Sequence, residues 1–197
     1  MIFTLLILLF SIIIHEIAHG SVAYALGDPT AKEAGRLDLN PLKHLDPIGS
    51  ILLPFFMSLL GGPIIGWAKP VPINPMYFRD QKWGELKVSL AGPLSNFTIA
   101  LIFGLIVKFI HLPESFLTIA TVVILYNIAL GIFNLIPIYP LDGSHVLFAL
   151  LPDRFEEFKR FLIQYGFVML LFLIFIIPSG LNWVFLLADK ILSLFLK

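Results

Sequence analysis

Six long runs of apolar residues dominate this chain. They cover residues 2–26, 48–66, 86–110, 116–136 with an extension to about 151, 161–177 and 181–196. A helix needs about 20 mostly apolar residues to cross the hydrocarbon core of a bilayer. Composition agrees, since 58% of the residues are hydrophobic and only 13% are charged, whereas a soluble domain has about 25% charged residues. The sequence therefore predicts an all-α polytopic membrane protein.

Two polar segments interrupt the early apolar runs. Residues 27–47 and 67–85 are rich in proline, glycine, asparagine and charge, a composition typical of loops and extended chain. The first apolar run lacks the charged start and the small-residue cleavage site of a secretory signal, so we expect a retained membrane helix. We also expect a single membrane-embedded domain over residues 1–197, with a core at 1–151 and a C-terminal helical hairpin at 161–196.

Charge and cysteine content exclude several function classes. The formal net charge is zero, so no basic excess points to a nucleic-acid partner. The chain contains no cysteine, which excludes disulfide bonds, thiol catalysis and cysteine-ligated metal sites. A metal site in this chain must therefore use histidine and acidic residues.

The sequence HEIAH at residues 15–19 places three polar side chains inside the first apolar run. His15 and His19 are four apart, so on an α-helix they lie on one face and can reach one ion, with Glu16 beside them to act on a water at that ion. Lining a helix interface is the structural alternative, but two of the five histidines of the chain fall in this motif. An uncompensated acidic residue at mid-bilayer costs about 2.5 to 3.5 kcal/mol on insertion scales. The pattern therefore favours a metal site with Glu16 as its catalytic residue.

A catalytic zinc site needs three protein ligands and an open position, so a third ligand is expected in another apolar segment. Asp142 lies between apolar residues just after Pro137 and Pro140, which interrupt the helix. Such a break at membrane depth is tolerated where the chain is buried or lines a cavity. His145, three residues later, either contacts a ligand residue without binding the metal itself or packs on a neighbouring helix. The other candidates have more ordinary interpretations, as an ion pair with Lys190 or as loop residues: Asp189, Asp46, His44 and His111.

Three stretches follow one another along the chain, namely HEIAH, AGPLSN at 91–96 and NLIPIYPLDG at 134–143. Together they resemble the site-2 protease family of intramembrane zinc metalloproteases. The resemblance implies that His15, His19 and Asp142 bind one zinc ion, that Glu16 is the general base and that Asn96 lies near the active site. We expect a short form of the family, without a PDZ or CBS domain.

The positions of the site residues along their segments predict the topology. If HEIAH, Asp142 and Asn96 meet at one depth, the first helix must end on the side from which the 86–110 helix starts. Residues 48–66 then begin and end on that side, so they cannot form a single crossing. Pro54 and the following GGP sequence supply breakers for a bend. We expect about five transmembrane helices, a re-entrant apolar hairpin at 48–66 and a short extended or β segment at 67–75.

Positive charge then predicts the orientation in the cell membrane. This topology leaves only Lys108 on the second side, and it places the remaining lysines and arginines on the side where the first helix ends. Cytoplasmic loops carry the excess of positive residues, so the N-terminus is expected outside and the active site toward the cytoplasm. The twelve residues assigned to the cytoplasmic side are Lys32, Arg36, Lys43, Lys69, Arg79, Lys82, Lys87, Arg154, Lys159, Arg160, Lys190 and Lys197.

The predicted partner is a membrane-protein substrate with a transmembrane segment, in the same lipid bilayer. A helical substrate must unwind before hydrolysis, and the proline-rich residues 66–75 offer an extended edge for pairing as an added strand; a plain interfacial loop is the alternative. Asn96 could donate to the substrate carbonyl as the oxyanion forms. Asn127 and Asn134, seven apart on one helical face, either hold the substrate backbone or form structural hydrogen bonds.

Three other functions use a similar residue set. A non-haem iron enzyme also uses two histidines and a carboxylate, but it has no need of Glu16. A metal-ion transporter would place polar groups along a path across the bilayer, whereas here they cluster near one face. A non-catalytic membrane scaffold is disfavoured by the intact HEIAH and LDG sequences. The sequence therefore predicts a zinc metalloprotease that cleaves within or near transmembrane segments.

Overall fold

The computed structural model describes residues 2–52, 55–56, 59, 68–175 and 181–195. Helix dominates these residues, and no β-strand is assigned within them. The predicted all-α class is therefore confirmed for the described chain. The helices are α1 (Ile2–Ala25), α2 (Thr30–Glu33), α4 (Gly84–Phe109), α5 (Glu114–Asn134), α6 (Asp142–Leu150), α7 (Glu156–Phe175) and α8 (Asn182–Leu192).

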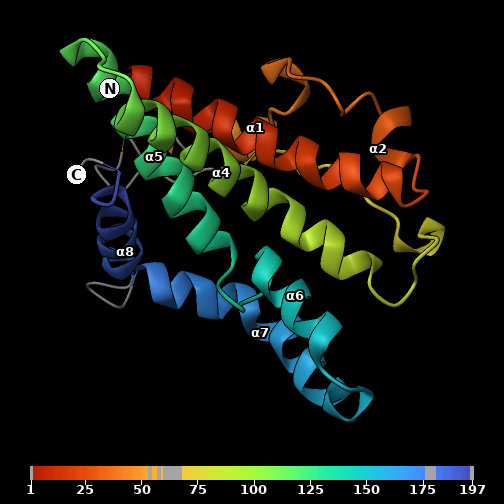
Figure 1. Ribbon diagram of the computed structural model, residues 1–197. Coiled ribbons are helices and arrows are strands. Elements are labelled where there is room, and N and C mark those ends of the chain that lie inside the picture. The colour runs from red at the N-terminus through yellow and green to blue at the C-terminus, as the bar shows by residue number, and fades with distance from the viewer. Residues whose placement is uncertain (1, 53–54, 57–58, 60–67, 176–180, 196–197) are drawn as a thin grey trace.

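Four of the described helices are long and apolar enough to cross a membrane, namely α1, α4, α5 and α7. At the centre of the molecule, α4 packs against both α1 and α5 (Figure 1). α8 falls within the fifth predicted span, but the helix contains 11 residues, which is shorter than the length that a crossing needs. A fifth crossing therefore stays a prediction.

A buried apolar cluster joins α4, α5 and α8. Ile124 and Ile128 of α5 pack with Ala100 of α4 and with Val184 and Ala188 of α8. In a bilayer, close packing of helices through small residues is a main source of association, because lipid is as apolar as the side chains. The alanines in this cluster allow that close approach, so α5 is held firmly beside α4.

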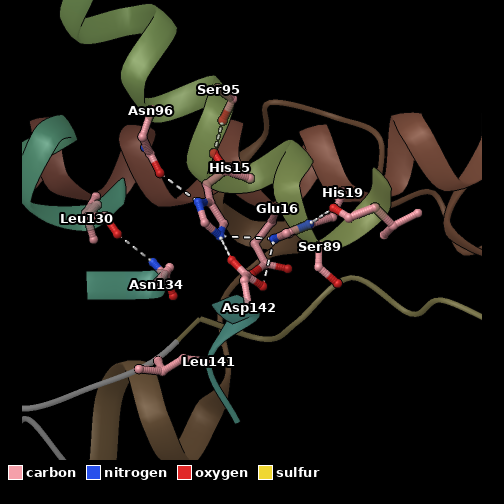
Figure 2. Close-up of polar contacts among 12 residues, drawn as sticks. His15, Glu16, His19, Ser89, Ser95, Asn96, Leu130, Asn134, Leu141 and Asp142 are labelled. Atoms are coloured by element: carbon pink, nitrogen blue, oxygen red, sulfur yellow. Dashed lines mark hydrogen bonds and ion pairs between the residues drawn. The ribbon is translucent and has the colours of Figure 1, made fainter. Parts of the chain in front are cut away.

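The predicted helix break before Asp142 is present. α5 ends at Asn134, turns occupy residues 135–141, and α6 begins at Asp142. Gly143 permits the tight approach of α6 to the end of α5, since a Cβ there would lie 2.6 Å from the carbonyl oxygen of Ile136. Asp142 is therefore held in the first turn of a new helix and is directed toward α1 (Figure 2).

The two polar segments fold together at the end of α1. The backbone N–H of Lys69 donates to the carbonyl of His44 over 2.9 Å. Ala23 of α1 and Val88 of α4 both pack with Phe78. α1 therefore ends, and α4 begins, at the same end of the molecule, as predicted. Short helical turns cover Pro41–Lys43 and Pro75–Tyr77 within these segments. A further turn, Pro47–Leu52, begins the apolar run that follows the first segment.

The predicted re-entrant hairpin at residues 48–66 lies largely outside the described residues and stays a prediction. The hydrogen bond between Lys69 and His44 ties the two ends of this segment together, which agrees with entry and exit on one side. Residues 68–74 carry neither helix nor strand. Asn74 has extended backbone angles, and the described chain provides no strand partner for this segment, so the predicted extended or β segment at 67–75 stays a prediction.

The direction of α8 differs from the prediction. Val184 and Leu130 line one cavity near the end of α5, and Phe195 lies against Gly104 near the end of α4. Because α4 and α5 run in opposite directions, α8 runs toward the side on which α4 ends. This direction differs from the predicted return of residues 181–196 to the side where α1 ends, because α8 packs along α4 and α5. The side on which Lys190 lies stays a prediction.

Candidate metal centre

Three side chains that are far apart in the sequence converge at one point. Nε2 of His15 lies 3.0 Å from Oδ2 of Asp142, and Nε2 of His19 lies 3.3 Å from Oδ1 of Asp142. The two Nε2 atoms are 3.0 Å apart. The candidate ligand atoms of this trio all lie within 4.8 Å of one another (Figure 2). The structure thus brings together the three residues that the sequence predicts as metal ligands.

Each histidine is oriented through its other ring nitrogen. Nδ1 of His15 donates to the side-chain oxygen of Asn96 over 2.6 Å, and Nδ1 of His19 donates to the carbonyl of Val88 over 2.7 Å. With the proton on Nδ1, each Nε2 presents a lone pair to the centre. Hydrogen bonding of the second ring nitrogen is the usual way in which proteins fix the tautomer of a metal-binding histidine.

The donor set fits a divalent cation. Oδ2 of Asp142 is buried and has no hydrogen-bond partner among the described residues, and it faces the Nε2 atoms of the two histidines. Converging lone pairs repel one another unless a cation lies between them. Two histidines and one carboxylate are a known ligand set for catalytic zinc, which keeps a fourth position for water or substrate.

α4 approaches this trio through a glycine. A Cβ at Gly92 would lie 2.5 Å from Nε2 of His15, and it would also overlap Nε2 of His19. Any larger residue would therefore occupy the space between the histidines. Gly92 belongs to the AGPLSN sequence, so the close approach gives a physical reason for the glycine in that stretch.

A buried polar network lies behind His15. The amide of Asn96 donates to the side-chain oxygen of Asn127 over 2.9 Å, and the amide of Asn127 donates to Oγ of Ser11 over 2.9 Å. Both asparagines are fully buried. The network satisfies these polar groups in an apolar interior and fixes the amide that accepts from His15. This geometry supports structural hydrogen bonding by Asn127, while the contact of Asn96 with substrate stays a prediction.

A cavity of about 400 Å³ opens beside the trio. Glu16 lines this cavity together with both histidines and Asp142. Its Oε2 accepts a hydrogen bond from the backbone N–H of Val71 over 2.8 Å. The Glu16 carboxylate therefore lies beside the candidate metal ligands, within a space large enough to hold water and part of a substrate.

Asn134 and His145 line the same cavity. The amide of Asn134 donates to the carbonyl of Leu130 over 3.0 Å (Figure 2). The ring of His145 lies 5.9 Å from that of Tyr139, measured between centroids. The described metal-ligand group contains neither residue. The role of Asn134 at the substrate and the supporting role of His145 at the site stay predictions.

The remaining sequence candidates lie outside this cavity. His44 is fully buried and bonds through Nε2 to the carbonyl of Asp38 over 2.7 Å. Asp46 accepts hydrogen bonds from the backbone of the turn that follows it. Asp189 lies on α8, and His111 lies in the connection between α4 and α5. The placements of His44, Asp46 and His111 agree with their interpretation as loop residues, whereas the ion pair of Asp189 with Lys190 stays a prediction.

The sequence interpretation missed three contributors to the site. Ser11 lies one turn before His15 on α1, so its helical spacing from HEIAH is a signal that was available. Gly92 stands inside a stretch that was singled out, but its role depends on how closely α4 approaches α1. The carbonyl of Val88 carries no side-chain signal, because any residue at that position supplies the same acceptor.

Comparison with known proteins gives a consistent assignment. Residues 109–173 match the model of Peptidase family M50. The chain is 39% identical to YwhC of Bacillus subtilis over 95% of this chain and 88% of the relative, and the name of YwhC describes it as a zinc metalloprotease. It is 35% identical to Rip2 of Mycolicibacterium smegmatis over 90% of this chain and 68% of the relative. It is also 33% identical to the zinc metalloprotease MJ0392 of Methanocaldococcus jannaschii, over 45% of this chain and 27% of the relative.

No solved structure matches the chain. The family match includes Asp142 and the helix break before it, and the similarity to YwhC extends over nearly the whole chain. The chain therefore belongs to peptidase family M50, which confirms the predicted site-2 protease relationship and the prediction of a metallopeptidase.

Proposed function

We propose that the protein is an intramembrane zinc metalloprotease that hydrolyses peptide bonds within or near the transmembrane segments of membrane proteins. The observation that carries this proposal is the convergence of His15, His19 and Asp142 beside Glu16, at a helix that is apolar enough to span a membrane. The donor set supports zinc as the bound metal, and the names of YwhC and MJ0392 support the same metal.

The chemistry follows from the positions of the protein groups. Zinc at this trio would polarise the scissile carbonyl and make a water reactive near neutral pH. Glu16 accepts a proton from the attacking water and delivers it to the leaving amide nitrogen. The N–H of Val71 occupies Oε2 of Glu16, so the other carboxylate oxygen carries the proton. Asn96 keeps the imidazole of His15 oriented throughout.

The surroundings of the site support a membrane-protein substrate. α1 and α4, which bring the site residues together, are both candidate membrane spans. Pro70, Val71 and Ile73 form one wall of the cavity, and polar loops at this end of α1 offer a route for water. The peptide bonds of a transmembrane helix are shielded by its own hydrogen bonds, so the substrate must unwind locally before it reaches Glu16.

Few backbone N–H groups of residues 69–75 are free to pair with a substrate strand. Prolines at 70, 72 and 75 have no N–H to donate. The N–H groups of Lys69, Val71 and Asn74 already donate within the protein. A substrate strand added here would therefore bind chiefly to carbonyl groups of the segment.

We propose a location in the cell membrane, with the N-terminus outside and the site toward the cytoplasm. With Lys190 left out of the count, Lys108 is on the outer side and ten described basic residues are on the inner side, so the bias keeps its sign. Those ten are Lys32, Arg36, Lys43, Lys69, Arg79, Lys82, Lys87, Arg154, Lys159 and Arg160.

The molecule beyond the site favours hydrolysis over metal transport. On the outer side of Asn127 the next cavity is lined by apolar residues such as Phe10, Ile14 and Phe103. A transport path would continue with metal-ligating side chains, and the described residues form no second group of this kind. Within the described part of the chain, this arrangement supports hydrolysis at one site over passage of a metal across the bilayer.

Reconstitution tests this proposal. The purified protein is incorporated into lipid vesicles with a single-span membrane protein, and fragments are identified by mass spectrometry. We expect cleavage within or close to the span, loss of cleavage on chelation and recovery with added zinc. Cleavage that is unaffected by complete metal removal would contradict the proposal. Zinc uptake into vesicles without any cleavage would favour a transporter.

A further inference from the structure

The proline-rich segment at residues 69–75, called the strap below, contacts the catalytic carboxylate directly. The N–H of Val71, near the middle of the strap, donates to Oε2 of Glu16 over 2.8 Å. Pro70, Val71, Ile73 and Pro75 also line the cavity that holds the metal-ligand trio. The strap therefore contributes both a wall of the site and a hydrogen bond to the proposed base.

The strap has little means of holding its own shape. Its three prolines cannot donate backbone hydrogen bonds, and residues 69–74 belong to no helix or strand. Proline restricts the backbone of the preceding residue to extended conformations, which limits the strap but does not place it against α1. Its position over Glu16 must therefore come from contacts with other parts of the chain.

Arg36 supplies the contact at the first end of the strap. Its guanidinium group donates to the carbonyl of Lys69 and, over 3.3 Å, to the carbonyl of Pro70. Arg36 is only 6% exposed, and it forms no ion pair with a described acidic residue. Burying an arginine charge against carbonyl groups alone is costly. A surface arginine avoids this cost because water solvates its guanidinium group, whereas Arg36 has only the carbonyl groups of the strap.

Asp28 supplies the contact at the second end. Its Oδ2 accepts from the N–H of Asn74 over 2.7 Å, while Oδ1 accepts from the N–H of Thr30 over 3.0 Å. The side chain is fully buried. The carboxylate therefore links the strap to the loop that follows α1, with Val71 lying between the two anchored ends.

A glycine on α1 allows the strap to pack closely against this helix. Gly20 follows His19 directly and lies one turn after Glu16. A Cβ at Gly20 would lie 2.9 Å from Cγ1 of Val71 and 2.6 Å from Leu37. The glycine therefore lets Val71 approach the same face of α1 that carries the catalytic carboxylate.

We propose that Arg36 and Asp28 are positioning residues, which clamp the strap at both ends so that the N–H of Val71 orients Glu16 for catalysis. This inference rests on the proposed function, in which Glu16 is the general base. Neither residue contacts the trio or lines the cavity beside it. Their effect reaches the reaction through the strap, and its loss leaves Glu16 free to rotate away from the attacking water.

The strap contacts are measured first by amide hydrogen exchange on the full-length, zinc-loaded protein in detergent. In the wild type we expect slow exchange at Val71 and Asn74. Arg36→Gln should speed exchange at Val71 by about tenfold or more, which is the change expected when a local opening becomes easier. Lys43→Gln is the matched control, because Lys43 lies in the same loop and pairs with Asp38 at the surface. Unchanged exchange at Val71 in both Arg36→Gln and Asp28→Ala would overturn the proposal.

Kinetics with a membrane-protein substrate then test the effect on catalysis. Arg36→Gln and Val71→Pro should lower kcat by about ten- to hundredfold, as for a misplaced catalytic group, with KM and zinc content nearly unchanged. Arg36→Lys should restore part of kcat, and the control Lys43→Gln should keep the wild-type kcat, because Lys43 pairs with Asp38 at the surface. A parallel loss of zinc, thermal stability and kcat without rescue by Arg36→Lys would show a purely structural role and overturn the proposal. A wild-type protein that cleaves no peptide would contradict the proposed function, whereas exchange at Val71 would still decide whether the clamp exists.

Discussion

His15 on α1 and Asn96 on α4 are 81 residues apart in the chain, yet Nδ1 of His15 donates to Oδ1 of Asn96 over 2.6 Å. This bond directs Nε2 of His15 toward Asp142. Asn96 is itself held by Asn127. The orientation of one candidate metal ligand thus depends on side chains from two further helices.

Removal of this bond should weaken metal binding. Asn96→Ala leaves His15 without its acceptor, and loss of such a partner typically reduces metal affinity or activity by about ten- to hundredfold. The measurement is zinc affinity by competition with a chelator of known strength. Thr98→Ala is the control, because Thr98 is an exposed residue on the same helix and bonds only within it. Equal zinc affinity in Asn96→Ala and wild type would contradict a supporting role for Asn96.

Asp142 should be required for zinc retention. Asp142→Asn removes a charged ligand from the trio, so the purified variant should contain much less zinc than the wild type. Asp189→Asn is the matched control, since Asp189 lies on α8, away from the trio. Metal analysis of both variants, purified in parallel, is the measurement. Full zinc content in Asp142→Asn would remove Asp142 from the ligand set.

Gly92→Ala should disable the site while leaving most of the fold intact. The added Cβ would occupy the space between the Nε2 atoms of His15 and His19, so the histidines must move apart. We expect strongly reduced zinc binding with a helical circular-dichroism spectrum close to that of the wild type. Ser95→Ala, one turn further along α4, should bind zinc normally. Normal zinc binding by Gly92→Ala would show that α4 does not approach the trio this closely.

Acid should destabilise the loop after α1 through Asp28. Burial alone would raise the pKa of this carboxyl, but hydrogen bonds from Thr30 and Asn74 outweigh burial and hold the pKa below its ordinary value of 3.8. A lowered pKa in the folded state contributes stability that is complete above the unfolded pKa and is lost as the pH falls through the folded pKa. Metal-free wild type should therefore lose thermal stability below about pH 4.

Asp28→Asn should reduce this dependence on pH. The measurement is the unfolding temperature of the metal-free protein in detergent, recorded from neutral to acidic pH for wild type and variant. Glu33→Gln, an exposed residue of the nearby α2, is the control and should follow the wild type. Identical pH profiles for Asp28→Asn and wild type would contradict a contribution from this carboxyl.

The helical segments and the candidate metal ligands could be predicted from the sequence because each has a local signal. Apolar length gives α1, α4, α5 and α7, and helical spacing places His15 and His19 on one face. Asp142 was identified because a carboxylate beside a proline break is unusual within an apolar segment. These features depend on neighbouring residues, so no tertiary information was needed.

The remaining features depend on tertiary contacts. The direction of α8 follows from its packing against α4 and α5, which its apolar pattern does not encode. The hydrogen bond of Val71 to Glu16 depends on a loop that folds back over α1, and Arg36 and Asp28 looked like ordinary loop residues in a polar segment. Their importance becomes visible only when their burial is known.

The central claim is that Glu16 acts as the base beside a zinc ion held by His15, His19 and Asp142. The most direct measurement compares wild type with Glu16→Gln in vesicles that contain a single-span substrate, with zinc content determined on the same samples. Glutamine keeps the shape and can still accept from Val71, but it cannot take up the proton. We expect full zinc content with cleavage reduced by about a hundredfold or more. Wild-type cleavage by Glu16→Gln would contradict the account.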